Sequence, residues 1–108
     1  MSNGSNPRTG QNPDSDLMED VRVDEPKLYK VIILNDDYTP MDFVVYVLKT
    51  FFSHDDVSAQ KIMLDVHQKG AGIAGVYSFE IAETKSYQAN QLSKQNKYPL
   101  KTTIEEES

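Results

Sequence analysis

The sequence contains no cysteine and no tryptophan. Without thiols the chain can form neither a disulfide framework nor a thiolate metal site. It has no apolar run long enough for a transmembrane helix, so we expect no membrane partner. The N-terminus lacks the apolar core of a secretory signal and is not the arginine-rich, acid-poor segment of a transit peptide. These absences predict a cytoplasmic protein.

Positive charge is also scarce, with 11 Lys and Arg against 17 Asp and Glu in 108 residues. This balance argues against nucleic-acid binding, which requires a basic surface. The length allows one modest domain. With only two histidines and no cysteine, the sequence offers little to hold a metal, and we expect no metal and no cofactor. We expect a monomer.

The chain divides into three parts by composition. Residues 1–27 are rich in Ser, Asn, Gly, Pro and Asp and have few apolar residues. Such a segment cannot offset the entropy of ordering, so we predict a disordered N-terminal extension. We predict a core domain over residues 28–105 and a short tail over residues 106–108.

The core domain contains six predicted elements. Apolar runs and alternation predict strands, and stripes at helical spacing predict helices. In chain order they are a strand at 29–34, helices at 41–52 and 57–69, a strand at 73–81, a helix from 82 to about 96 and a strand at 100–105. Asp55 or Ser53 is a candidate cap for the second helix, and Gly70 is its predicted C-terminal glycine. The third helix has few apolar positions, so we expect it to be largely solvated.

This order predicts the fold class. A β-α-α-β-α-β chain of this size forms a two-layer α+β sandwich, with three helices packed on a three-stranded antiparallel sheet. The first strand, the corner that follows it and the start of the next helix contain the polar residues of most interest.

That corner is Asn35-Asp36-Asp37, where residues that favour turns end the strand. We predict Thr39 as the N-cap of the following helix, Pro40 as its first residue and Asp42 as a capping-box partner. Two readings remain open. The corner only turns and caps, or it recognises a cationic group that carries an apolar body.

Five segments of the core carry a specific pattern, namely YKVIILNDDYTPMDFV at 29–44, MLDVH at 63–67, GVY at 75–77, AETK at 82–85 and PL at 99–100. In this order and spacing they resemble the ClpS family, the adaptors of the bacterial ClpA–ClpP protease. The resemblance implies an adaptor, not an enzyme, that recognises N-degrons, meaning proteins whose first residue is Leu, Phe, Tyr or Trp.

The resemblance also implies roles for individual residues. Asn35, Asp36 and His67 match the family's contacts to the free α-amino group. The residues that match the walls of its side-chain pocket are Asp37, Thr39, Met41, Val44, Met63, Val66 and Leu100. Glu80 and Lys85 match the face that docks on the N-terminal domain of ClpA, an AAA+ unfoldase. The extension matches the arm that other members use in substrate delivery.

The chemistry of these residues agrees with that implication. An ammonium group seeks acceptors, which an Asn carbonyl, an Asp carboxylate and a neutral imidazole supply. Two alternatives stay open. Asp36, Asp37 and His67 are also the groups of an acid–base enzyme, and a structural interaction domain of ribosomal-stalk type shares the predicted element order.

Overall fold

The computed structural model describes residues 26–107. Most of the predicted disordered extension therefore lies outside the described residues. The elements are β3 (Tyr29–Leu34), α2 (Met41–Phe51), α3 (Asp56–Lys69), β4 (Ala71–Tyr77), α4 (Phe79–Gln95) and β5 (Lys101–Glu106). The first strand has the predicted bounds, and the predicted order β-α-α-β-α-β is confirmed.

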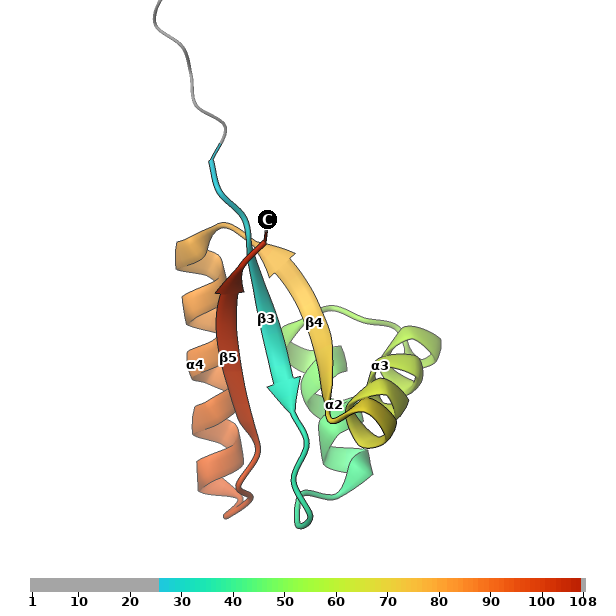
Figure 1. The fold of residues 1–108 in the computed structure, drawn as a ribbon. Helices are drawn as coiled ribbons and strands as arrows, with labels where there is room; N and C mark the ends of the chain where they lie inside the picture. The colour runs from blue at the N-terminus through green and yellow to red at the C-terminus, as the bar shows by residue number, and fades with distance from the viewer. Residues whose placement is uncertain (1–25, 108) are drawn as a thin grey trace, which may run out of the picture.

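The three strands form one antiparallel sheet in the order β4-β3-β5. Figure 1 shows α2 and α4 behind this sheet, with α4 along β5 and α3 beside β4. The predicted two-layer α+β sandwich is confirmed. Within residues 26–107, no helix is long and apolar enough to cross a membrane.

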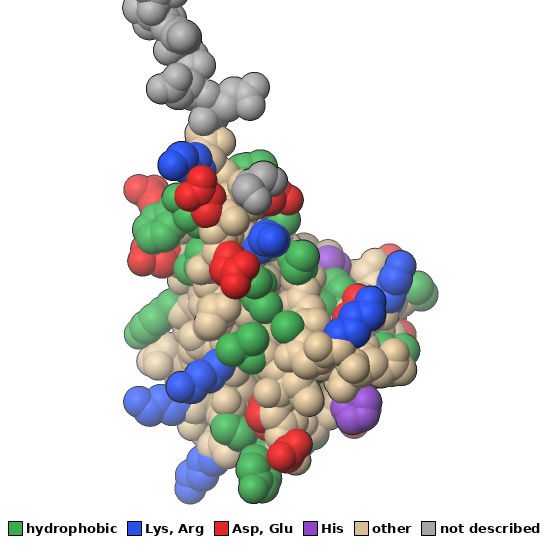
Figure 2. All heavy atoms as spheres, viewed as in Figure 1, with side chains coloured by type: hydrophobic (Ala, Val, Ile, Leu, Met, Phe, Trp, Pro, Cys, Tyr) green, Lys and Arg blue, Asp and Glu red, His purple; other side chains and the backbone are tan. Residues whose placement is uncertain are grey.

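The core lies between the sheet and the helices. Val31 and Ile33 of the central strand are fully buried, and Ile33 pairs with Gly72 on one side and Thr102 on the other. Alternation sends the intervening side chains to the opposite face. That face retains some apolar surface, since Ile73 is 49% exposed. Figure 2 shows hydrophobic side chains in the middle of this face.

His54 binds the backbone of β4 at a bulge in that strand. The register with β3 shifts between Val31 and Ile32, so Ala74 is an extra residue in β4. His54 Nε2 lies 2.5 Å from the Ala74 carbonyl oxygen, to which it donates. The link between α2 and α3 is therefore tied to the sheet, and His54 satisfies a buried backbone acceptor.

The start of α2 differs from the prediction. The helix begins at Met41, its N-cap is Pro40, and no side chain caps it. Thr39 is not the cap, because its hydroxyl and its backbone N–H both donate to the carboxylate of Asp36. The predicted capping box with Asp42 is therefore absent. The Thr39 hydroxyl stabilises the turn at Asp36 and does not cap α2.

The ends of α3 follow the prediction more closely. Asp55 is the N-cap, and its side chain accepts a hydrogen bond of 2.8 Å from the Ser58 N–H. That backbone bond is the main reason why the pKa of Asp55 is lowered. Gly70 ends the helix in the left-handed conformation, with φ of 89°, and its N–H donates to the Val66 carbonyl.

Residues 79–81, predicted to end the second strand, instead form the start of the third helix. β4 ends at Tyr77, not at Ile81, and α4 starts at Phe79 after the extended N-cap Ser78. The alternating apolar residues of this stretch resemble a strand. In the structure, however, Phe79 packs its ring edge-on against Tyr29, with 5.1 Å between centroids, from the first turn of the helix.

The expectation that α4 is largely solvated is also wrong for one face. This face is buried and consists of small residues, namely Ala82, Ser86, Ala89 and Ser93. Against it lies Thr102 of β5, whose N–H donates to Asn90 Oδ1 at 2.9 Å and whose hydroxyl pairs with the Ser86 hydroxyl. Small side chains allow the helix to approach closely, and hydrogen bonds satisfy its buried polar groups.

The last strand ends one residue beyond the predicted core domain. Glu106 still pairs with Tyr29, and the Glu107 N–H donates to the Leu28 carbonyl at 2.8 Å. Lys27 Nζ lies 3.5 Å from Glu106 Oε2 in an exposed ion pair. The first and last residues of the core domain therefore lie next to each other, at the same end of the sheet (Figure 1).

Candidate functional site

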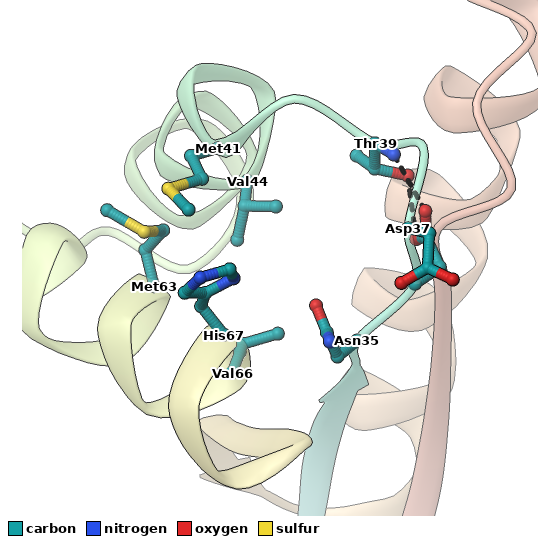
Figure 3. Close-up of a pocket in the computed structure, with 9 residues that line it drawn as sticks. Asn35, Asp37, Thr39, Met41, Val44, Met63, Val66 and His67 are labelled. Atoms are coloured by element: carbon teal, nitrogen blue, oxygen red, sulfur yellow. Dashed lines mark hydrogen bonds between the residues drawn. The ribbon is translucent and has the colours of Figure 1, made fainter.

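A pocket of about 220 Å³ opens between the β3–α2 corner and helices α2 and α3. Nine residues line it: Asn35, Asp36, Asp37, Thr39, Met41, Val44, Met63, Val66 and His67. All nine are among the residues to which the family resemblance assigned contacts with the α-amino group or the first side chain. Residues more than 30 positions apart in the sequence thus meet in one site (Figure 3).

The inner walls of the pocket are apolar. Val44 of α2 and Met63 and Val66 of α3 are all buried members of the hydrophobic core. Met41 stands at the first turn of α2 and is 42% exposed, so it forms part of the rim. A Met side chain is unbranched and adaptable, which suits a wall that touches ligands of different shape. The pocket is therefore continuous with the core of the protein.

The mouth of the pocket is polar. Asn35 follows the last residue of β3, and His67 lies in the last turn of α3. Figure 3 shows both side chains directed into the same gap, with Met41 and Val44 across from them. The Asn35 N–H donates to the Gly70 carbonyl at 3.0 Å, which ties the end of β3 to the end of α3. One backbone hydrogen bond thus positions Asn35 relative to His67.

Asp36 is the anchor of the corner. Its Oδ1 accepts the Tyr38 N–H at 2.8 Å and the Thr39 N–H at 2.7 Å, and its Oδ2 accepts the Thr39 hydroxyl at 2.7 Å. Partial burial raises the pKa of Asp36, but the hydrogen bonds from the Thr39 side chain and from the two backbone groups outweigh it, and the pKa is lowered. The carboxylate is therefore charged near neutral pH and has lone pairs left for a further donor.

One predicted wall residue lies elsewhere. Leu100 is 3% exposed and does not line this pocket. The chain turns at Tyr98 and Pro99 after α4, and Leu100 then points into the core before β5 begins. It borders a different hollow, together with Asn90 and Tyr98.

The two residues matched to the docking face lie on α4, in its first turns. Glu80 is exposed, and it lines a shallow groove with Ile81, Thr84, Lys85 and Gln88. Lys85 Nζ donates to the Phe51 carbonyl at 2.7 Å and stands 5.3 Å from the centroid of the Tyr77 ring. The ammonium therefore satisfies a carbonyl at the end of α2, a role that the sequence did not reveal.

The size and polarity of the pocket limit what it can hold. Sites for small molecules and cofactors usually measure about 300–1,000 Å³, whereas this one measures about 220 Å³. It is large enough for a single apolar side chain, and its polar mouth suits a polar group attached where that side chain begins. Within residues 26–107, no group of three or more His, Asp or Glu side chains is arranged to hold a metal ion.

The charge state of Asp36 also bears on the enzyme alternative. A general acid or base works best when its pKa is near the operating pH. The pKa of Asp36 is shifted the other way, below its ordinary value of 3.8. The carboxylate is thus an acceptor of hydrogen bonds and a fixed negative charge at the mouth of an apolar pocket.

Known proteins resemble this chain over its whole core. The sequence profile described as "ATP-dependent Clp protease adaptor protein ClpS" matches residues 24–103. The ATP-dependent Clp protease adapter protein ClpS of Bdellovibrio bacteriovorus is 63% identical over 87 residues, which cover 81% of this chain and 76% of that protein. The protein of the same name from Hyphomonas neptunium is 45% identical over 113 residues, covering 98% and 96%.

A solved structure shares the fold. The structure of Agrobacterium tumefaciens ClpS2 bound to L-phenylalaninamide superposes with a TM-score of 0.75 at 43% sequence identity, over 77% of this chain and all of that one. The profile match over most of the chain, the identity to the two relatives and this structural match lead to one conclusion. The chain belongs to the ClpS family of adaptor proteins of the ATP-dependent Clp protease.

Proposed function

We propose that this chain is an N-degron adaptor, which binds proteins whose first residue is Leu, Phe, Tyr or Trp. The observation that carries the proposal is the pocket itself, where an apolar cavity sized for one side chain opens at acceptors for a cation. A free N-terminal residue has this pair of features, an ammonium and a side chain on adjacent atoms. The relative ClpS2, solved with L-phenylalaninamide, supports the same chemistry.

In the proposed complex, Asn35, Asp36 and His67 bind the α-amino group. The α-ammonium donates one hydrogen bond to the Asn35 side-chain oxygen and one to the Asp36 carboxylate. It donates the third, directly or through water, to His67 in its neutral form. Hydrogen bonds of this charged kind contribute about 1.5–3 kcal/mol each. An acetylated terminus has neither the charge nor the donors, so it leaves the acceptors unpaired.

The first side chain enters the apolar part of the pocket, against Val44, Met63 and Val66. Burial of a Leu or Phe side chain contributes roughly 1.5–3 kcal/mol. Together with the contacts to the ammonium, and after the cost of association, this supports micromolar or tighter binding. One chain supplies every residue of the pocket, so we propose that a monomer binds the substrate.

We further propose that the adaptor delivers its substrates to a ClpA-type AAA+ unfoldase in the bacterial cytoplasm. Glu80 and the groove beside it on α4 are the proposed docking face for the N-terminal domain of that partner. Lys85 contributes mainly by fixing α4 to the end of α2, since its ammonium already has a partner. The N-terminal extension is proposed to engage the unfoldase during delivery.

Dye-labelled peptides that differ only at the first residue test the binding proposal by fluorescence anisotropy. We expect a Phe peptide to bind far more tightly than the same peptide with acetyl-Phe or with Gly first. Replacement of His67 by Ala should weaken the Phe peptide, whereas the matched change Tyr87→Ala, on the exposed side of α4, should not. Equal binding of Phe and acetyl-Phe would refute recognition of the α-amino group.

Delivery is tested with purified ClpA and ClpP and a folded reporter protein that begins with Phe. The adaptor should accelerate degradation of this reporter, and Glu80→Ala should remove the acceleration without changing the anisotropy titration. If Glu80→Ala behaves like the unmodified adaptor in both assays, the docking face lies elsewhere.

A further inference from the structure

The strand β4 passes α3 more closely at Gly72 than a residue with a side chain would allow. A Cβ placed on Gly72 would lie 2.8 Å from Val66 Cγ2 and 3.2 Å from the backbone oxygen of Ile62. Gly70 is the glycine with positive φ in the described chain, so Gly72 is not needed for an unusual backbone conformation. What it provides is space.

The space is occupied by a wall of the proposed binding pocket. Val66 is 3% exposed and lines the pocket, and its Cγ2 methyl rests over the backbone of Gly72. Val is branched at Cβ and has one strongly preferred rotamer in a helix. A methyl group that is displaced from Gly72 therefore has to move with the whole Val66 side chain, toward the pocket.

The surrounding structure holds the helix α3 in place. The connection from α3 to β4 contains only Gly70, whose N–H donates to the Val66 carbonyl and whose carbonyl accepts the Asn35 N–H, both at 3.0 Å. Helix α3 also packs against α2, and its residue Met63 belongs to the same buried core as Val44 of α2. The helix is held on both sides, so the side chain of Val66 yields before the helix does.

We propose that Gly72 is a specificity-determining residue, which sets the depth of the pocket by giving the Val66 side chain room against β4. The proposal rests on the proposed function, because depth matters only if a first side chain enters. Gly72 does not touch the ligand. It acts through Val66, and large planar side chains that reach the bottom of the pocket depend on it most.

The variant Gly72→Ala should therefore change the ranking of first residues. We expect binding of a Phe peptide to weaken by about tenfold and binding of a Leu peptide by less than about threefold, as in an overpacked apolar site. Val66→Ala removes the colliding methyl and should deepen the pocket, which raises the preference for Phe over Leu. In the double variant no Cγ2 methyl is left to be displaced, so the Phe-to-Leu ratio should stay close to that of Val66→Ala alone.

The matched control is Gly75→Ala in the same strand. Its Cβ would meet the ring of Tyr77, which does not line the pocket. This change should lower stability and leave the Phe-to-Leu ratio unchanged. Loss of stability alone is thereby separated from loss of pocket depth.

The experiment is an anisotropy titration of the full chain and these variants with two peptides that differ only in Phe or Leu at the first position, with thermal unfolding measured beside it. If Gly72→Ala leaves the ratio unchanged, or if its effect persists when Val66 is Ala, the proposal is overturned. If Gly72→Ala does not fold, the comparison of the double variant with Val66→Ala decides in the same way. If the unmodified chain does not prefer Phe over acetyl-Phe, it is the proposed function that fails.

Discussion

The variant Asp36→Asn separates two roles that the carboxylate combines. In the structure the carboxylate holds the corner through three hydrogen bonds, two from backbone N–H groups and one from the Thr39 hydroxyl. In the proposed complex it also faces an ammonium. An Asn side chain keeps one carbonyl oxygen for the two backbone groups but has no charge. Asp36→Ala removes both features.

The expected magnitudes follow from these contacts. A hydrogen bond to a charged group contributes about 1.5–3 kcal/mol and a neutral one about 0.5–1.5 kcal/mol, so neutralising the acceptor should cost roughly 1–1.5 kcal/mol of binding. That corresponds to a weakening of about five- to twelvefold. The Ala variant should bind more weakly still, and it should also lose about 1–3 kcal/mol of unfolding free energy, which the Asn variant largely keeps.

The pH dependence has a definite sign. The pKa of Asp36 is lower in the folded protein, since its hydrogen bonds outweigh the effect of burial. A lowered folded-state pKa means that the stabilisation is complete above the ordinary value of 3.8 and disappears as the pH falls through the lowered value. The stability difference between Asp36 and its Ala variant should therefore be constant between about pH 5 and 8.

The assay is anisotropy with a Phe peptide, combined with urea unfolding, at two salt concentrations. Asp42→Asn is the matched control, because it removes the same charge from an exposed side chain in the first turn of α2 that does not line the pocket. If Asp36→Asn binds within about twofold of the unmodified chain, the charge is not used for the ligand and the carboxylate only holds the turn. If both Asn variants weaken binding equally, the peptide is attracted by the overall negative charge near the pocket and not by a direct contact with Asp36.

Two further predictions concern Met41 and Lys85. Met41→Ala should loosen the rim and allow peptides that begin with Ile or Val to bind; no gain in their titration would mean that Met41 is only a wall. Lys85→Met should lower the unfolding free energy by about 1–3 kcal/mol, through loss of the bond to the Phe51 carbonyl and of the contact with the Tyr77 ring, as measured in urea. Unchanged stability would show that this contact is not used.

The order of elements could be predicted because each has a local signal. The run of β-branched residues in β3 is followed at once by turn formers, and Gly70 ends α3 in the conformation that glycine adopts most easily. The start of α4 has no such signal. Its first residues alternate like a strand, and the polar N-cap Ser78 makes no side-chain capping bond that would mark a boundary. Here tertiary packing, through Phe79 against Tyr29, decides the outcome.

The candidate site was more predictable than the packing that supports it. Polar residues at the end of β3 and a histidine near the end of α3 are conspicuous in the sequence, and the family resemblance joins them. The resemblance also implied Leu100, which the structure instead places in the core. The hydrogen bonds that Thr39 gives to Asp36 could not be foreseen, because a Thr before a helix equally predicts a cap.

The hardest features to predict are those in which a small residue stands where a large one would be expected. The serines of α4 look like solvent-facing residues in the sequence, yet Ser86 and Ser93 are buried, and each has a hydrogen-bond partner that a sequence pattern cannot supply. In the sequence Gly72 looks like part of a loose connection before the strand predicted at 73–81, whereas β4 already begins at Ala71. The role of Gly72 depends on its neighbour in α3, since a methyl group of Val66 occupies the space that a Cβ would need. In both cases the informative quantity is the distance between two elements, and for α3 and β4 we propose that this distance sets the depth of the pocket.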